Sequence, residues 1–342
     1  MKKISNEIKR VILITLLSKV FIWLCGYIGW QFFHSIIFTS NCINNSFLQI
    51  WTTWDASWYL LIAKSGYVYS LTFAFFPLYP FLIRLLSYLT NNFELSGFLI
   101  SNFMSFIAAI YLFKIVKLEY GSKIAYKSIL YFSLFPGSLF LSALYAESLF
   151  ATLLIVSFYY ARKGEWWKSG IAGFFSSMTR PIGFLIFIPL IYEYFKQYKI
   201  TKLNKVFNIK KNILFLLLIP LGFALVLGYF YTLSHDSFIY INAVGNPEWN
   251  IRLESPWTTL LNSIKYINDS DSFILYEMNI LTFGFNYIFL IFFIFLTILG
   301  KKYLRNIYMI FIIINILVIL FVFSALEDSI RFSIPVFPFF ML

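Results

Sequence analysis

One acid, Asp55, stands out because its neighbours are almost all aromatic or aliphatic. It lies in the stretch WTTWDASWYLLIAKSGY, residues 51–67, which holds three tryptophans and two tyrosines beside this single carboxylate. A carboxylate in apolar surroundings costs free energy unless a partner or a reaction uses it. Two interpretations are open: an acid among lipid headgroups on an amphipathic surface helix, or a general base in a partly dry pocket. We take the second as the working hypothesis, which makes Asp55 the candidate catalytic residue.

Aromatic residues around this acid recur at helical spacing. Trp51, Trp54 and Trp58 are three and four residues apart, so we expect one aromatic stripe along a helix. Tyr59 shares the neighbouring face with Asp55.

Three other charged residues lie within or beside apolar runs. Arg180 falls at the middle of one run in MTRPIGF, and an arginine at membrane depth indicates function because it needs an anionic partner or ligand. Glu147 in SALYAESLFA and Arg331 in LEDSIRFSIPVFP lie at the ends of other runs. The alternatives are structural. Glu147 would cap a helix, Arg180 would pair with Asp55 or Glu147, and Arg331 would pair with Glu327 or Asp328.

Several classes of chemistry have no counterpart in the sequence. It contains no phosphate loop, dinucleotide fingerprint or nucleophile elbow. Cys25 and Cys42 have no obvious partner, and the two histidines lie in no ligand spacing. We therefore predict neither a cofactor nor a metal site.

The composition is that of a multi-spanning membrane protein. The 342 residues are 60% hydrophobic and only 12% charged, with a mean hydropathy of +0.79. The net charge is +12, but 20 of the 27 lysines and arginines fall in five short segments that adjoin apolar runs. This pattern predicts topology by the positive-inside rule and argues against a nucleic-acid partner. The segments are 1–10, 114–127, 162–168, 196–211 and 301–305.

Apolar runs predict an all-α polytopic protein with roughly eight to ten transmembrane helices. We expect one integral membrane domain over residues 1–342, located in the cell membrane, or in the endoplasmic reticulum membrane if the source is eukaryotic. The final run reaches about half of a ~30 Å hydrocarbon core, so we expect a C-terminus that is truncated or shorter than in relatives. The runs are 11–33, 71–90, 98–113, 128–142, 144–161, 169–195, 212–233, 278–299, 303–325 and one that begins near Ser333.

Orientation gathers the candidate groups on one side. If the basic segments are cytosolic, the first external loop is 34–70, with interfacial helices to residue 90, and the second large external loop is 234–277. The run 71–90 then begins and ends outside, and Pro77, Pro80 and Arg84 favour a re-entrant or interfacial element. The run 169–195 has basic segments at both ends, so we expect two half-helices that meet at TRPIG.

The ordered motifs resemble those of the PIG-V family, which includes the second mannosyltransferase of glycosylphosphatidylinositol assembly and many prokaryotic relatives. They are WDASWYLLIAKSGY, AFFPLYPFLIR, YAESLF and TRPIG. DSFIYINAVGNPEWNIRLESPW, residues 236–257, and RFSIPVFP are similar to later segments of the family. The resemblance covers nearly the whole chain from about residue 10. It implies the glycosyltransferase C class, a polyprenyl-phosphate sugar donor (classically dolichyl-phosphate mannose), and an acceptor on the non-cytosolic face.

The resemblance also implies an inverting, metal-optional reaction whose base is an Asp of the first external loop, which matches Asp55. We expect Arg180 or Arg331 to hold the donor phosphate. The expected partners are a lipid-linked sugar donor, a glycolipid, glycan or protein acceptor, and the bilayer. An alternative is a lipid-linked-sugar flippase or secondary transporter, since buried charges beside half-helices also describe transporters. The predicted substrate-binding residues are Trp54, Trp58, Tyr59, Tyr79, Arg84, Tyr145, Glu147, Ser148, Arg180, Trp249, Arg252 and Arg331.

Overall fold

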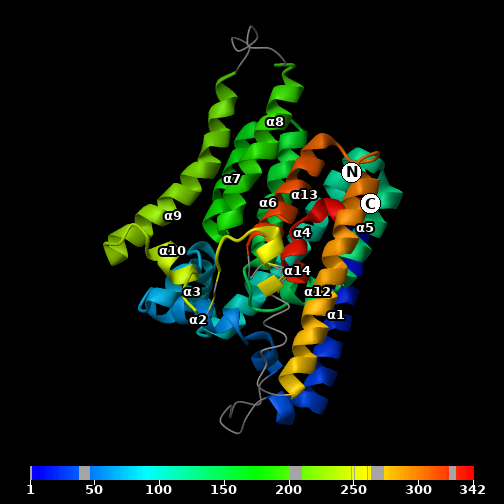
Figure 1. Cartoon of the computed structure of the whole chain (residues 1–342). Helices are drawn as coiled ribbons and strands as arrows, with labels where there is room; N and C mark the ends of the chain where they lie inside the picture. The colour runs from blue at the N-terminus through cyan, green and yellow to red at the C-terminus, as the bar shows by residue number, and fades with distance from the viewer. Residues whose placement is uncertain are drawn as a thin grey trace.

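The chain folds into a bundle of helices of very different lengths (Figure 1). The computed structural model describes residues 2–37, 47–200, 210–247, 249, 251–259, 261–262, 273–322 and 329–342. Within these ranges no β-strand forms, and a single isolated bridge joins Leu253 to Val322. The predicted all-α class is therefore confirmed.

Four helices pack one against the next: α4 packs against α6, α6 against α7, and α7 against α9, which lies at the edge of the bundle (Figure 1). The first of them begins where the Asn92 side chain accepts a hydrogen bond from the Leu95 N–H at 2.9 Å, which satisfies one of the free N–H groups of the first turn. Glycines allow α7 and α9 to approach closely. The bounds are α4 Phe93–Tyr120, α6 Glu147–Arg162, α7 Trp166–Thr179 and α9 Leu218–Ser234.

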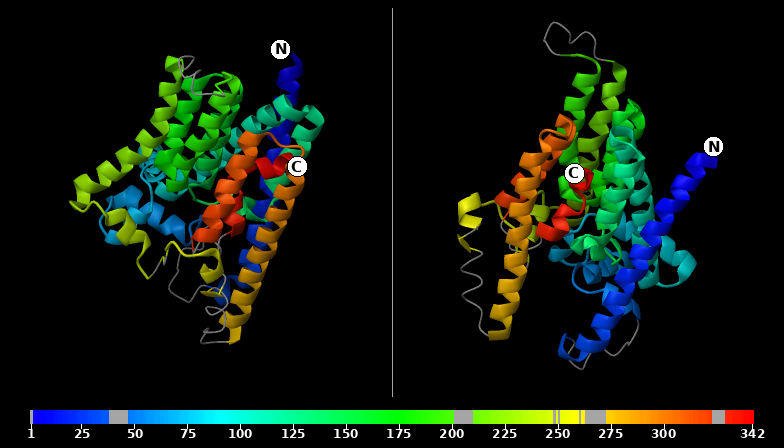
Figure 2. Two further views of the ribbon diagram at one scale, coloured as in Figure 1. Left: turned by 45° about the horizontal axis from the view of Figure 1, so that its top comes forward. Right: turned by 90° about the vertical axis from the view of Figure 1, so that its right-hand side faces the viewer.

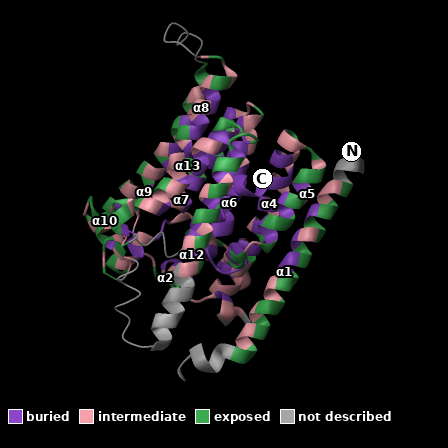
Figure 3. Ribbon diagram, turned by 45° about the vertical axis from the view of Figure 1, so that its right-hand side comes forward, coloured by how far each residue is buried: buried purple, intermediate pink, exposed green. Residues whose placement is uncertain are grey.

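Further helices pack around these four. Helix α1, Lys2–Ile37, packs against α4 and α5, and it exposes an apolar face of the kind that lipid covers (Figure 3). Helix α12, Phe273–Gly300, packs against α13, Asn306–Phe321. In the right-hand view of Figure 2, α1 and α12 flank the bundle and lie apart from each other.

Length and composition identify membrane-crossing candidates. Among the described residues, three helices are long and apolar enough to cross a membrane: Asn6–Phe32, Phe93–Tyr120 and Lys211–Ser234. Shorter apolar helices cover Leu78–Thr90, Gly284–Gly300 and Asn306–Phe321. These helices identify a membrane protein, while the total of roughly eight to ten crossings stays a prediction.

The two interrupted runs break where the sequence predicts. Helix α7 ends at Thr179, Arg180 has an extended backbone, and a 3-10 turn, η4 (Pro181–Ile186), leads into α8 (Phe187–Gln197). In the other run, η2 (Ser70–Ala74) is separated from α3 (Leu78–Thr90) at Pro77. Both breaks lie next to a proline, which has no N–H to donate and restricts the residue before it.

The predicted single span over 128–142 is wrong. Helix α5, Ser122–Leu134, ends early, and a 3-10 helix, η3 (Pro136–Leu141), follows it. Phe135 is extended because it precedes Pro136. The last described segment is also divided: it forms two short buried pieces, α14 (Ser329–Ser333) and η8 (Phe337–Met341).

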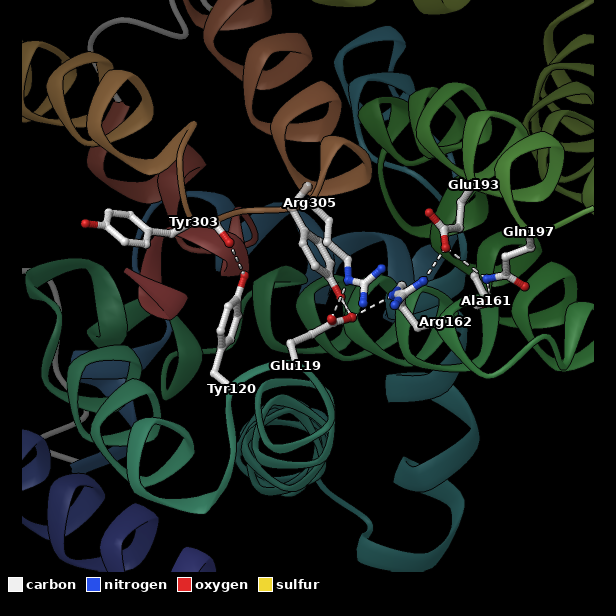
Figure 4. A network of polar contacts seen from close by, with 9 residues as sticks. Glu119, Tyr120, Ala161, Arg162, Glu193, Gln197, Tyr303 and Arg305 are labelled. Carbon is white, nitrogen blue, oxygen red and sulfur yellow. Dashed lines mark hydrogen bonds and ion pairs between the residues drawn. The ribbon is translucent and has the colours of Figure 1, made fainter. Parts of the chain in front are cut away.

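A buried polar network joins four helices at one end of the bundle (Figure 4). The carboxylate of Glu119 accepts from the Nε atoms of Arg162 and Arg305, each at 2.6 Å, and from the Tyr308 hydroxyl at 3.0 Å. Arg162 also pairs with Glu193 of α8. Arg162 is the last residue of α6 and Glu147 the first, so the network lies roughly 24 Å along the helix from Glu147. From the sequence, the arginines of this network were predicted only to indicate membrane topology.

Packing of α7 on α9 gives a test of the fold. A Cβ on Gly222 would lie 2.5 Å from the Phe174 carbonyl oxygen, whereas one on Gly228 of the same helix would meet nothing within 4 Å. We expect Gly222→Leu to lower the free energy of unfolding by about 1–3 kcal/mol through overpacking. Gly228→Leu should leave it nearly unchanged. Unfolding titrations in SDS measure both, and equal effects of the two variants would contradict this packing.

Candidate active site

Asp55 is the first residue of α2, Asp55–Ser65. The preceding residue, Trp54, has a left-handed backbone with φ of 53°, so the chain turns sharply into the helix. A carboxylate in the first turn interacts favourably with the helix dipole. The predicted aromatic stripe is wrong for this reason: Trp51 is buried at the end of η1 (Phe47–Trp51), Trp54 is 76% exposed, and only Trp58 lies within the helix.

Four charged side chains form a continuous ladder beside this helix start. Arg180 Nη1 and Arg331 Nε both donate to the same oxygen, Oε1, of Glu147. Arg331 Nη2 donates to Asp55 Oδ2 at 2.5 Å. The order is therefore Arg180, Glu147, Arg331, Asp55, which we call the charge ladder. Two arginines and two carboxylates leave it with no net charge.

Different elements supply the four residues of the charge ladder. Glu147 begins α6, Arg180 occupies the break between α7 and η4, Arg331 lies in α14, and Asp55 begins α2. The side chains of the charge ladder become more exposed from Glu147 towards Asp55: Glu147 is 0% exposed, Arg331 8% and Asp55 18%. Asp55 is therefore an accessible end of the charge ladder, whereas Glu147 and Arg331 in its middle are buried.

Two of the structural alternatives can now be judged. Arg180 pairs with Glu147, as the salt-bridge alternative expected. Arg331 pairs with Asp55 and Glu147, whereas Glu327 and Asp328, its expected partners, lie outside the described residues. Both arginines therefore meet carboxylates, and one of those carboxylates is the candidate base.

Aromatic rings enclose the charge ladder. The Tyr145 ring centroid lies 4.8 Å from Arg331 Cζ, and the Phe140 centroid lies 5.4 Å from it, which are cation–π distances. The Tyr145 hydroxyl also donates to the Thr53 carbonyl at 3.0 Å. Tyr145 therefore joins the guanidinium of Arg331 to the backbone two residues before Asp55.

A second aromatic group lies along α2. Trp58 stacks on Phe75 with centroids 6.1 Å apart, and Trp249 meets both rings edge-on, at 5.6 Å and 5.3 Å. Tyr59 meets Phe75 edge-on at 5.0 Å. Burial raises the pKa of the Tyr59 hydroxyl well above its ordinary value, and the charge of Glu147 adds to the rise. Tyr59 is therefore neutral at physiological pH and available as a hydrogen-bond donor.

Four more of the predicted binding residues are not members of the charge ladder. The Tyr79 hydroxyl contacts Ser101 Oγ at 2.6 Å and is buried. Arg84 donates to the Ala63 and Lys64 carbonyls at 2.6 and 3.0 Å, so it caps the C-terminal end of α2. Arg252 pairs with Glu254 at 2.5 Å and is half-exposed. Ser148 is buried directly after Glu147, and its hydroxyl has no partner among the described residues.

An apolar cavity of about 430 Å³ adjoins the site. It lies between α1, η1, α5, η3 and the segment that follows η3, and it shares Thr53, Trp54 and Tyr145 with the surroundings of the charge ladder. No local sequence signal marks it, because its walls come from parts of the chain about 100 residues apart. Its apolar lining includes Phe21, Ile22, Ile50, Leu134, Phe135, Leu139 and Phe140.

The comparison with known families assigns this all-α membrane protein to the class of membrane glycosyltransferases. The family described as mannosyltransferase (PIG-V) matches residues 30–255. The chain belongs to this family of membrane mannosyltransferases, which confirms the resemblance seen in the motifs. Comparison with curated proteins gave no match, and comparison with solved structures gave none. The matched range includes Asp55, Glu147 and Arg180, while Arg331 lies beyond it.

Glu147 provides a test of the charge ladder. Its replacement by leucine keeps the volume but leaves the guanidinium groups of Arg180 and Arg331 without the carboxylate they share. We expect Glu147→Leu to lower the free energy of unfolding by about 3–5 kcal/mol, the cost of breaking a buried ion pair. Unfolding in SDS measures the loss. Glu165→Gln, which removes surface pairs with Lys163 and Lys168, is the matched control. A Glu147→Leu protein as stable as this control would contradict the ladder.

Proposed function

We propose that the protein transfers mannose from a polyprenyl-phosphate donor to a hydroxyl of a glycolipid, glycan or protein on the non-cytosolic face of the membrane. Family membership supports the mannosyl transfer. The observation that carries the rest is the charge ladder, in which an accessible carboxylate, Asp55, contacts a guanidinium held from behind by the buried Glu147.

Asp55 is the general base in this proposal. The acceptor hydroxyl gives its proton to the carboxylate while its oxygen attacks C1 of mannose, and the bond from C1 to the phosphate oxygen breaks with its electron pair on that oxygen. Glu147 is buried and bound by two arginines, so it is not placed to act as a second, nucleophilic carboxylate. A single displacement inverts the configuration at C1.

Arg331 holds the donor phosphate. The leaving phosphate gains negative charge as the bond breaks, and a fixed guanidinium stabilises that charge. Arg331 Nη2 contacts Asp55 in the structure, so phosphate and Asp55 compete for the same group. Donor binding then releases the Asp55 carboxylate from Arg331, so that it can accept a proton from the acceptor hydroxyl. Because the arginines supply the positive charge, the proposed reaction requires no divalent metal.

The surrounding surfaces suit the rest of the donor. Trp58 and Trp249, both only partly buried, offer faces against which a sugar ring packs, next to Asp55 along α2. The apolar cavity of about 430 Å³ is suited to the first isoprene units of the lipid. Trp54 and Tyr145, which lie beside the charge ladder, form part of its wall, and apolar residues of α1 form another part.

Orientation follows from the distribution of basic residues. Lys117, Arg162 and Arg305 lie at the end of the bundle opposite Glu147, where they pair with Glu7 and Glu119. By the positive-inside rule that end faces the cytosol, which puts Asp55 on the other side of a multi-pass protein of the glycosyltransferase C class. The flippase or transporter alternative has no support from the family match.

The proposal predicts the behaviour of Asp55→Asn. An amide cannot accept the proton, so we expect transfer of radiolabelled mannose from polyprenyl-phosphate mannose to fall by about 10²–10⁴-fold in purified membranes. Expression and unfolding should change little, because the amide still accepts a hydrogen bond from Arg331. The assay contains EDTA, in which wild-type transfer should continue.

Glu94→Gln is the matched control, since Glu94 lies in the first turn of α4 at the same end of the bundle and outside the charge ladder. It should retain wild-type transfer. Equal transfer by wild type and Asp55→Asn would remove Asp55 as the base. Absence of transfer by the wild type, with mannose donors of several chain lengths, would overturn the donor assignment.

A further inference from the structure

Leu141, the last residue of η3, and the non-helical residues 142–146 that follow it lead into α6, and we call residues 141–146 the α6 approach. It carries Tyr145, which packs on Arg331, and leads directly to Glu147. Ser142, Leu144 and Tyr145 are all buried. Non-helical backbone away from water must find hydrogen-bond partners for its carbonyl groups, because none come from a helix ladder.

Side chains of two neighbouring helices supply these partners. Lys19 Nζ of α1 donates to the Leu141 carbonyl at 2.7 Å and to the Ser142 hydroxyl at 2.9 Å. From α4, Asn102 Nδ2 donates to the Ser142 carbonyl at 3.1 Å. A further bond from α4 joins Ser101 Oγ to the Tyr145 carbonyl, also at 3.1 Å. The α6 approach is therefore fixed from both sides by groups outside it.

Lys19 is an expensive group for this purpose. It lies within the apolar part of α1, is 4% exposed, and has no carboxylate within ion-pair distance among the described residues. It lines a small cavity with hydroxyl-bearing residues, among them Thr15, Ser105 and Ser138, and with apolar ones such as Ile22 and Phe132. An amino group taken out of water costs free energy unless it is hydrogen-bonded, and an apolar side chain would pack this helix more cheaply. The free energy spent on burying Lys19 indicates that this residue has a role beyond helix packing.

We propose that Lys19 is a positioning residue for the active site. It acts through the α6 approach: its Nζ atom donates to the Leu141 carbonyl and the Ser142 hydroxyl, which sets the place of Tyr145. Tyr145 in turn orients Arg331 through its ring and contacts the Thr53 carbonyl through its hydroxyl. Lys19 itself touches neither substrate nor reacting atoms. The effect on catalysis rests on the function proposed above.

Kinetics distinguish positioning from a purely structural role. In Lys19→Met the side-chain volume is kept and both hydrogen bonds are lost. We expect the KM for a short-chain polyprenyl-phosphate mannose to rise about tenfold, the effect of a lost hydrogen bond. Partial unfolding would lower only the amount of active enzyme and leave KM unchanged. Lys19→Gln can still donate to the Leu141 carbonyl and should recover part of the loss.

Thr15→Val is the matched control. Thr15 lies one turn before Lys19 in the same small cavity, and its hydroxyl donates only within its own helix, to the Val11 carbonyl at 2.9 Å. It should keep the wild-type KM. An unchanged KM in both Lys19 variants would overturn the proposal, and if Lys19→Met does not accumulate, Lys19→Gln alone decides it by a raised or unchanged KM.

Hydrogen exchange gives a reading that needs no activity. Lys19→Met should accelerate exchange in the peptide that covers residues 141–146, which includes the Leu144 N–H bonded to the Trp51 carbonyl at 2.9 Å. Exchange at the far end of α6 should not change. Unchanged exchange at 141–146 would contradict the positioning role even if the protein transferred no mannose, whereas accelerated exchange without wild-type transfer would count against the proposed donor alone.

Discussion

A single buried oxygen, Glu147 Oε1, accepts hydrogen bonds from two arginines, and the site depends on this contact. Each guanidinium would be costly to bury alone, and the carboxylate would be costly without them. Because both arginines bind the same Glu147 oxygen, this contact fixes the break after α7, the start of α6 and the short helix α14 relative to one another. Asp55 then meets a cation whose position is already determined.

The charge balance of the ladder connects structure with mechanism. A site with spare positive charge would bind any anion, and one with spare negative charge would repel a phosphate. Here the charges cancel, and the donor phosphate has to replace Asp55 at Arg331. In this account the base becomes available only when the donor is bound.

Much of the fold could be predicted from local sequence. Apolar runs between basic segments indicated an all-α membrane protein, and prolines located the breaks after Thr179 and before Leu78. The same logic overlooked Pro136, which ends α5 early, although proline was the available signal. The aromatic stripe failed because helical spacing across Trp51–Trp58 does not show that the helix begins only at Asp55.

The site could be predicted only as separate residues. Asp55, Glu147, Arg180 and Arg331 each stand out because charge is costly in apolar surroundings. The pairing of Arg180 with Glu147 was one of the alternatives considered, but the contacts of Arg331 could not be read from the sequence, since Asp55 and Arg331 are 276 positions apart. Lys19 was overlooked because one lysine in an otherwise apolar run gives no indication of the carbonyl groups it meets. Such backbone partners depend on packing and leave no periodic pattern.

Donor binding to Asp55→Asn tests the central claim, that Asp55 and the phosphate compete for Arg331, most directly. The measurement is the Kd of a short-chain polyprenyl-phosphate mannose for purified wild-type protein and for Asp55→Asn, with Arg331→Gln as a reference for a lost phosphate contact. The account predicts tighter binding to Asp55→Asn than to wild type, because an amide holds Arg331 less strongly than a carboxylate. Equal or weaker binding to Asp55→Asn would contradict it.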